Sequence, residues 1–272
     1  MLEIPYAELH SFPDGDRPHT GNPAGVALLE VPISDADMLG LAQSNNLSET
    51  AFLVPGEAVD VWNLRWFTPG CEVSLCGHAT LAAAVWLFET GRVAGETAGF
   101  DTASGRLAVT READDAFVMD FPRVDFRPAE PDPDVVAALG AGAPEAAFDL
   151  DRVHGPAYRM FVYADEAAVA GLNPDIAALA AAGVNVIATA PGASADFVSR
   201  FFAPASGVAE DPVTGSAHCT LAPYWAERLG RAELAARQIG RRPGALRVRA
   251  RNDGRVELIG TARRYLDGVI RL

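Results

Sequence analysis

Cysteine is scarce in this chain of 272 residues, which contains three. So few cysteines, in an odd number, do not form a disulfide framework, and free thiols are typical of a reducing compartment. The first residues show no basic segment followed by an apolar stretch, so they do not resemble a secretory signal. No window approaches the roughly 20 apolar residues of a membrane helix. We therefore expect a cytoplasmic protein that is not embedded in a membrane.

Basic residues are also few. The chain has 22 Lys and Arg but 36 Asp and Glu, which gives a formal net charge of −14. An acidic protein repels nucleic acid and anionic lipid, so the sequence predicts neither as a partner. The basic residues that gather between Arg237 and Arg251 are interpreted as a solvated pair of strands. The overall charge does not exclude an acidic substrate, because the local field governs a binding site.

Short strand-like runs alternate with helical stretches along the chain. The segment Arg127–Pro133 is rich in proline and charge and is the best candidate for a linker. It predicts two lobes, residues 1–126 and 127–272, with the last strand a candidate to return to the first lobe. Leu81–Thr90 and Cys219–Leu229 are expected to form apolar, buried helices that end at a glycine. The other expected elements are strands at 26–29, 51–54, 63–67, 107–110, 116–121, 157–162, 184–189 and 196–202, and helices at 35–44, 134–139 and 175–182.

An internal sequence repeat relates the two halves of the chain. The segment 65–69 (RWFTP) resembles 200–204 (RFFAP), and each is followed by a loop, a glycine and a helix. Within the two helices one constant spacing relates three pairs of residues: Gly77 and Gly215, Trp86 and Tyr224, and Glu89 and Glu227. The repeated order favours a duplicated half-domain over a chance similarity of two alanine-rich segments. Two such copies usually pack about a pseudo-twofold axis, with a ligand cleft between them.

Two junctions between a loop and a helix, at 71–80 and 209–218, contain the residues of greatest chemical interest. A helix N-terminus offers free N–H groups and the positive end of the helix dipole, so it can bind a carboxylate or stabilise an enolate. The structural alternative is capping by Ser216 and a tight turn at each glycine. That alternative does not explain His78 or Asp211.

Three ionisable side chains are candidates for proton transfer. His78 lies where a helix dipole favours neutral imidazole, which suits a proton shuttle, although a buried histidine bonded to backbone fits the same position. Asp211 is compatible with steadying its loop and with orienting an acid or base. Glu49 precedes an apolar strand and is a general base if an apolar pocket raises its pKa; otherwise it is an exposed loop residue.

Four segments resemble the PhzF-like (phenazine biosynthesis-like) family: GNPAGV (21–26), SETAFL (48–53), RWFTPGCEVSLCGHATLAAA (65–84) and FFAPASGVAEDPVTGSAHC (201–219). The resemblance spans nearly the whole chain, and CGHAT and EDPVTGSAH are its most specific motifs. It implies the α+β fold of the diaminopimelate epimerase type, in which two similar lobes are related by a pseudo-twofold axis. In each lobe a sheet wraps around a central helix. The resemblance also implies a homodimer and no cofactor. One carboxylate can serve as base and then as acid, so no metal is required.

The resemblance implies a role for each motif residue. Glu49 would take a proton from one carbon of a small acidic metabolite and return it to another, as in the isomerisation of a dihydro-hydroxyanthranilate. His78 and Asp211 would assist this proton shift. The implied substrate-binding residues are Asn22, Ser48, Gly77, Gly215 and Ser216. Phenazine synthesis itself does not follow, because a fold and its acid–base machinery do not fix a biosynthetic pathway.

Three alternatives remain beside this isomerase. An amino- or hydroxy-acid epimerase with two thiols would use Cys76, but the counterpart of that residue at the duplication spacing is Thr214, which carries no thiol. A non-catalytic small-molecule binding protein would not require the base Glu49. A metal site is the third alternative, although its irregular spacing matches no zinc motif. Its ligands would be Cys71, Cys76, His78, His218 and Cys219.

Overall fold

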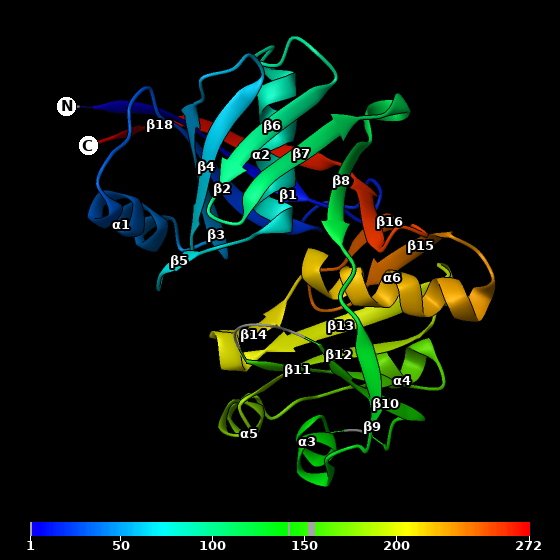
Figure 1. Ribbon diagram of the computed structural model, residues 1–272. Coiled ribbons are helices and arrows are strands. Elements are labelled where there is room, and N and C mark those ends of the chain that lie inside the picture. The colour runs from blue at the N-terminus through cyan, green and yellow to red at the C-terminus, as the bar shows by residue number, and fades with distance from the viewer. Residues whose placement is uncertain (1, 141, 152–155) are drawn as a thin grey trace. The chain divides into compact units, whose positions relative to one another are not determined.

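The computed structural model describes residues 2–140, 142–151 and 156–272. The chain forms two compact units (Figure 1). The first unit contains Met1–Asp120 and Ile259–Leu272, and the second contains Phe121–Leu258. The sequence places this boundary at residue 126 and leaves the last strand as a candidate to return. In the structure the last strand, β18, pairs with β1 inside the first unit.

The first unit folds its sheet around one apolar helix, α2. β2 pairs antiparallel with β1 and parallel with β3, while β4 runs antiparallel to β3 and parallel to β6. The crossover from β4 to β6 contains β5 and α2, and α2 contacts β1, β2 and β3. Because α2 is apolar on all sides, the unit buries it almost completely. In chain order the elements are β1 (Glu3–Ser11), β2 (Asn22–Leu28), α1 (Asp35–Asn45), β3 (Glu49–Pro55), β4 (Val61–Phe67), β5 (Glu72–Val73), α2 (Gly77–Glu89), β6 (Thr97–Thr102), β7 (Gly105–Arg111), β8 (Phe117–Pro122) and β18 (Ala262–Arg271).

The second unit repeats this pattern of pairing. β11 pairs antiparallel with β10 and parallel with β12, while β13 runs antiparallel to β12 and parallel to β15. The crossover from β13 to β15 contains β14 and the buried helix α6. The shared topology supports the duplication that segments 65–69 and 200–204 predict. In chain order the elements are β9 (Phe126–Ala129), α3 (Pro133–Ala138), β10 (Ala146–Leu150), β11 (Ala157–Val162), α4 (Glu166–Ala170), α5 (Ile176–Ala181), β12 (Val184–Pro191), β13 (Phe197–Ala203), β14 (Val208–Asp211), α6 (Gly215–Leu229), β15 (Glu233–Gln238), β16 (Gly244–Ala250) and β17 (Arg255–Gly260).

Helix α6 contains a proline in its interior, Pro223. Proline has no N–H, so it cannot bond to the carbonyl of Cys219 four residues earlier. That carbonyl accepts a hydrogen bond from the backbone N–H of Val124 at 3.2 Å instead. The Thr220 hydroxyl donates to the Val124 carbonyl, also at 3.2 Å. The chain just before β9 therefore supplies the hydrogen bond that the proline removes.

The sequence predicts most elements correctly, with one clear error. Both apolar helices are confirmed, although they begin four residues earlier than predicted, at Gly77 and Gly215. The interpretation of Arg127–Pro133 as a linker is wrong, because Phe126–Ala129 forms β9 and pairs antiparallel with β10. Pro128 is tolerated in this strand because β9 pairs on one side, and a strand edge needs no N–H from proline.

The mixed sheets and few helices confirm the α+β class. Each unit has its sheet around one central helix, as the resemblance implies. Within the described ranges, no helix combines the length and the apolar character needed to cross a membrane.

Candidate functional site

The N-termini of α2 and α6 differ from those of the other helices. Four helices begin with a side-chain oxygen that accepts a backbone N–H of the first turn. These capping residues are Ser34, Asp132, Asp165 and Asp175. Cys76 and Thr214, which cap α2 and α6, have extended backbones and make no such side-chain bond. Capping by a side chain is worth about 1 kcal/mol, so its omission leaves first-turn N–H groups for another acceptor.

Glu49 and His78 meet at the start of α2. Glu49 is the first residue of β3, and His78 is the second residue of α2. Glu49 Oε2 lies 3.2 Å from His78 Nε2, and the two side chains are 17% and 6% exposed. The distance is that of an ion pair, and the two atoms are not hydrogen bonded to one another in this geometry. The interpretation of Glu49 as an exposed loop residue is therefore wrong.

The other side of the His78 ring faces two polar groups. Its Nδ1 lies 3.2 Å from Asn22 Nδ2 and 3.5 Å from Cys76 Sγ. The Ser48 hydroxyl donates to Asn22 Oδ1 at 3.4 Å. The backbone of His78 is held as well, since the Ser11 hydroxyl donates to its carbonyl at 2.6 Å. These contacts orient the imidazole toward Glu49.

Burial controls the protonation of His78. It lowers the pKa of this imidazole to about 4, because a buried imidazolium loses its hydration. His78 is thus neutral near pH 7, as its position on the helix predicts. A neutral imidazole presents either an N–H or a lone pair at Nε2, according to its tautomer. It can therefore hydrogen bond to Glu49 whether that carboxyl group is ionised or protonated.

In the second unit, Asp211 is tied to the start of α6. Asp211 Oδ2 accepts a hydrogen bond from the Thr214 hydroxyl. Gln238, at the end of β15, donates from Nε2 to the Asp211 carbonyl at 2.6 Å and accepts the Thr214 N–H at 3.0 Å through Oε1. Gln238 is 1% exposed. This buried amide fixes both ends of the loop 211–214.

His218 is a buried histidine of a structural kind. Its Nδ1 lies 2.8 Å from the Thr214 carbonyl, and its ring lies 5.9 Å from that of Phe197. Burial lowers the pKa of His218 to about 4. The hydrogen bond to a carbonyl four residues earlier places the proton on Nδ1, so the side chain anchors the first turn of α6.

The structure gathers some of the predicted site residues and not others. Around α2 it brings together Asn22, Ser48, Glu49, Gly77 and His78. Asp211, Gly215 and Ser216 belong to the second unit. The alternative that Ser216 caps the helix is wrong, because Thr214 occupies the N-cap position and Ser216 is exposed in the first turn of α6.

The alternative of a metal site, which the sequence analysis leaves open, names a different combination of ligands. Glu49, Cys76 and His78 offer one ligand atom each within 4.8 Å of one another, the one such trio in the described part of the chain. The predicted set lacks Glu49 and includes Cys71, which is exposed. Glu49 and His78 approach one another directly at 3.2 Å, so a small rotation of either side chain is enough to align them for proton transfer.

Gln238 is the site residue that sequence reasoning misses. Leu234, Ala236 and Gln238 are buried at alternate positions of β15. A glutamine at an inward position of an alternating strand needs buried partners, and that pattern is the signal that could have indicated it.

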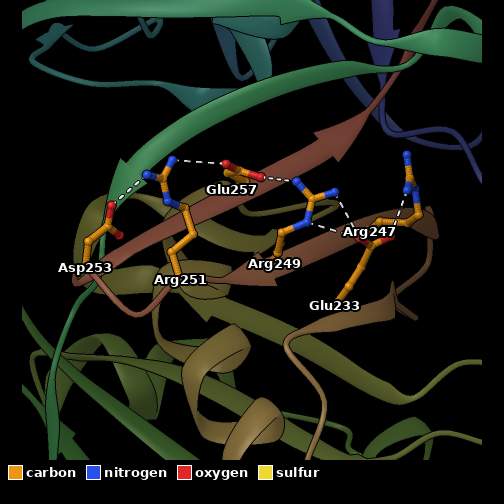
Figure 2. Close-up of polar contacts among 6 residues, drawn as sticks. All are labelled: Glu233, Arg247, Arg249, Arg251, Asp253 and Glu257. Atoms are coloured by element: carbon orange, nitrogen blue, oxygen red, sulfur yellow. Dashed lines mark hydrogen bonds and ion pairs between the residues drawn. The ribbon is translucent and has the colours of Figure 1, made fainter.

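Three arginines of the segment predicted to be a solvated strand pair form ion pairs with neighbouring acidic residues of the same unit (Figure 2). Arg247 bonds to Glu233 at 2.8 Å, and Arg251 bonds to Asp253 at 2.6 Å. Arg249 lies between them and bonds to Glu233 at 2.9 Å and to Glu257. The side chains of these three arginines are about 34 to 46% exposed, as expected for strands that face solvent.

The fold is that of α+β proteins of the epimerase type, and comparison with known proteins gives the family. The model of the phenazine biosynthesis-like protein family, PhzC-PhzF, matches residues 14–268. The chain is 45% identical over 273 residues to uncharacterized isomerase PA3578 of Pseudomonas aeruginosa, with 100% of both chains covered. The crystal structure of a PhzF-family phenazine biosynthesis protein of Enterococcus faecalis matches at 42% identity, with a TM-score of 0.90 and 100% of both chains covered. The chain therefore belongs to the phenazine biosynthesis-like family.

A more distant structure shares the fold. The predicted epimerase PA4716 of Pseudomonas aeruginosa matches with a TM-score of 0.76 at 24% identity, over 99% of each chain. Several relatives within the family are named isomerases, which assigns this chain to the isomerases.

Proposed function

We propose that this isomerase shifts a proton between two carbons of a small carboxylate-bearing metabolite, without a cofactor. The reaction would be similar to the isomerisation of a dihydro-hydroxyanthranilate. The observation that carries the proposal is the 3.2 Å contact between Glu49 Oε2 and His78 Nε2 at the start of α2. A carboxylate held against a neutral imidazole in a mostly buried place is suited to accept a proton and to return it.

The proposed step begins with Glu49 as a carboxylate. It takes a proton from a carbon next to an unsaturated or carbonyl group, and the electron pair of the C–H bond becomes a delocalised anion on the substrate. First-turn N–H groups of α2, near Gly77, stabilise that anion. Glu49, now protonated and hydrogen bonded to His78, returns the proton to a second carbon. Atoms and charge balance without a co-reactant.

Further residues take supporting roles in the proposal. Asn22 and Ser48 orient His78 and lie beside the position of the substrate. Asp211 is proposed as a second acid–base group, and Gly215 and Ser216 as substrate contacts, on the basis of the family motif EDPVTGS. The proposal also includes a cytoplasmic homodimer.

The test is uptake of solvent deuterium. Purified protein is incubated in heavy water with small carboxylic acids, including a dihydro-hydroxyanthranilate and amino acids, and the products are read by mass spectrometry. Glu49→Gln keeps the shape of the side chain and removes the base, while Glu57→Gln changes an exposed glutamate of the same unit. We expect exchange by wild type and by Glu57→Gln, and a loss of at least about 100-fold in Glu49→Gln. Equal exchange by all three proteins would remove Glu49 from its role.

An epimerase is a second candidate, because Cys76 Sγ lies 3.5 Å from His78 Nδ1. A thiol beside an imidazole at a helix N-terminus is activated toward proton transfer. In that case Cys76→Ser would abolish exchange at the Cα of an amino or hydroxy acid, and chiral chromatography would show inversion in wild type. A ligand that binds tightly but never exchanges hydrogen would favour a binding protein instead.

A further inference from the structure

A cavity of about 330 Å³ opens on the second unit, between helix α4, the residues before β10 and the residues after β11. Its volume is at the lower end of the range of small-molecule pockets, about 300–1,000 Å³. Most of its wall is alanine and glycine, including Ala143, Ala164, Ala167 and Ala168. Its described lining residues all belong to the second unit and include none of the residues of the candidate functional site. The cavity is therefore a second concave site of the chain.

A buried tyrosine in this lining has a hydroxyl without a partner. Tyr163 follows β11 directly, and its backbone N–H donates to the Thr189 carbonyl at 2.8 Å. Tyr163 is 3% exposed and packs in an apolar cluster with Val169 and Leu172. Its hydroxyl makes no hydrogen bond to any residue that the structure describes. A buried polar atom without a partner is unfavourable, so a ligand that bonds to this hydroxyl removes that cost.

A carboxylate of the same lining also lacks a partner. Glu145 precedes β10, and its backbone N–H donates to the Val162 carbonyl at 2.7 Å, which places it beside the end of β11. Within residues 2–140, 142–151 and 156–272, its side chain forms no hydrogen bond or ion pair. The described lining contains no Lys, Arg or His. Burial raises the pKa of Tyr163 to about 12, so the charge of this described lining near pH 7 is that of Glu145.

We propose that this cavity binds a small primary amine with an apolar body. An ammonium group has three N–H donors and no acceptor, and both Glu145 and Tyr163 offer oxygen acceptors. A positive charge is favoured beside an unpaired carboxylate, whereas an anion is repelled. The alanine methyl groups contact the apolar body. The proposed substrate of the candidate functional site carries a carboxylate, so the amine is a different ligand.

The test is a matched series of ligands titrated into the full chain at pH 7 and followed by isothermal titration calorimetry. The compounds 2-phenylethylamine, 2-phenylethanol and phenylacetate share an aromatic body and carry a positive, a neutral and a negative head group. We expect the amine to bind with a Kd at least about tenfold below that of the alcohol, because hydrogen bonds between charged groups are stronger. Phenylacetate should not bind in the cavity. Any binding of phenylacetate to the candidate functional site should be unchanged by substitutions in the cavity.

Two substitutions with matched controls assign the binding to the cavity. Glu145→Gln should raise the Kd of the amine at least about tenfold and leave that of the alcohol nearly unchanged. Glu130→Gln changes an exposed glutamate of the same unit and should have no effect. Ala167→Leu places a larger side chain in the cavity and should abolish binding, whereas Ala170→Leu changes an exposed alanine of α4 outside the lining and should not.

Tyr163→Phe separates ligand binding from stability. It should raise the Kd of the amine about three- to tenfold. It should not lower the free energy of unfolding in urea, because the hydroxyl has no partner among the described residues. Circular dichroism checks the folding of each variant. Failure of the amine to bind wild type, equal affinity for the amine and the alcohol, or binding that survives Ala167→Leu would each overturn the proposal.

Discussion

Arg65 and Arg200 occupy equivalent positions in the two repeated segments, and they test how burial determines the free energy that an ion pair contributes. Arg65 and Arg200 each make two hydrogen bonds to a glutamate of the next strand, Glu72 and Glu210. Each guanidinium also lies over a phenylalanine ring two residues later, at 5.1 and 4.8 Å. These shared contacts match, and Arg65 has a further ion pair with the exposed Asp35 at 2.8 Å, so the number of contacts alone would not make Arg65 the weaker of the two.

Burial separates the two pairs. The side chains of Arg65 and Glu72 are 38% and 37% exposed, whereas those of Arg200 and Glu210 are 9% and 18% exposed. Arg200 also donates to the carbonyl of Leu172 at 2.7 Å. Removing one partner of a buried pair leaves an uncompensated charge and costs about 3–5 kcal/mol, while an exposed pair contributes about 0–1 kcal/mol.

We therefore expect Arg200→Met to lower the free energy of unfolding by about 3–5 kcal/mol and Arg65→Met by no more than about 1 kcal/mol. Methionine retains the apolar stem in both cases. Urea unfolding followed by circular dichroism measures the difference, and the midpoint of thermal unfolding should fall by roughly 10 °C for Arg200→Met. Adding Glu210→Gln to Arg200→Met should recover part of the loss, because the unpaired carboxylate is gone. Equal costs at Arg65 and Arg200 would refute the reasoning.

Three further predictions concern protonation, positioning and capping. Folding lowers the pKa of His78 and of His218 to about 4, so the unfolded chain binds more protons than the folded chain between about pH 4 and 6.5. The free energy of unfolding should therefore fall as the pH drops through that window. The variant His218→Phe should make the slope of unfolding free energy against pH shallower. Gln238→Leu should lower deuterium exchange about tenfold or more, because it releases the Asp211 loop. Gln238→Glu keeps the acceptor for the Thr214 N–H and should lose less exchange activity. Equal losses in the two variants would contradict a positioning role for Gln238. Ser34→Ala should cost about 1 kcal/mol in urea unfolding through loss of the α1 cap, without any change in exchange.

Local patterns in the sequence predict the elements well, because apolar helices and alternating strands have distinct periods. They predict the start of α2 and α6 less well, since Gly77 and Gly215 are poor helix formers that the fold places in the first turn. The strand β9 was missed because proline and charge at a strand edge resemble a linker. In each case the missing information is a partner from a distant part of the chain.

The candidate site shows the same division. The motifs predict which residue types occur near the α2 start, yet they do not give the distance between Glu49 and His78, which depends on the pairing of β2 with β3. The burial that lowers the pKa of His78 is likewise a property of the whole unit. Gln238 and Asp211 are brought together only by the pairing of β13 with β15 and the return of the chain through α6.

The duplicated fold explains why the two central helices begin without a side-chain cap while the four others have one. A helix without a side-chain cap is less stable by about 1 kcal/mol. The fold omits the cap at the start of both α2 and α6, so each unit loses this stabilisation at the equivalent position. Departures from local stability rules are expected where function requires the groups concerned. At this position the first unit has a buried imidazole beside a carboxylate, whereas the second has the exposed Ser216 at the place of His78. Substitution of Cys76 by Ser is then informative in a further way. If the first-turn N–H groups serve a ligand, a serine that caps them should stabilise α2 and weaken anion binding together, whereas a purely structural helix start would gain stability alone.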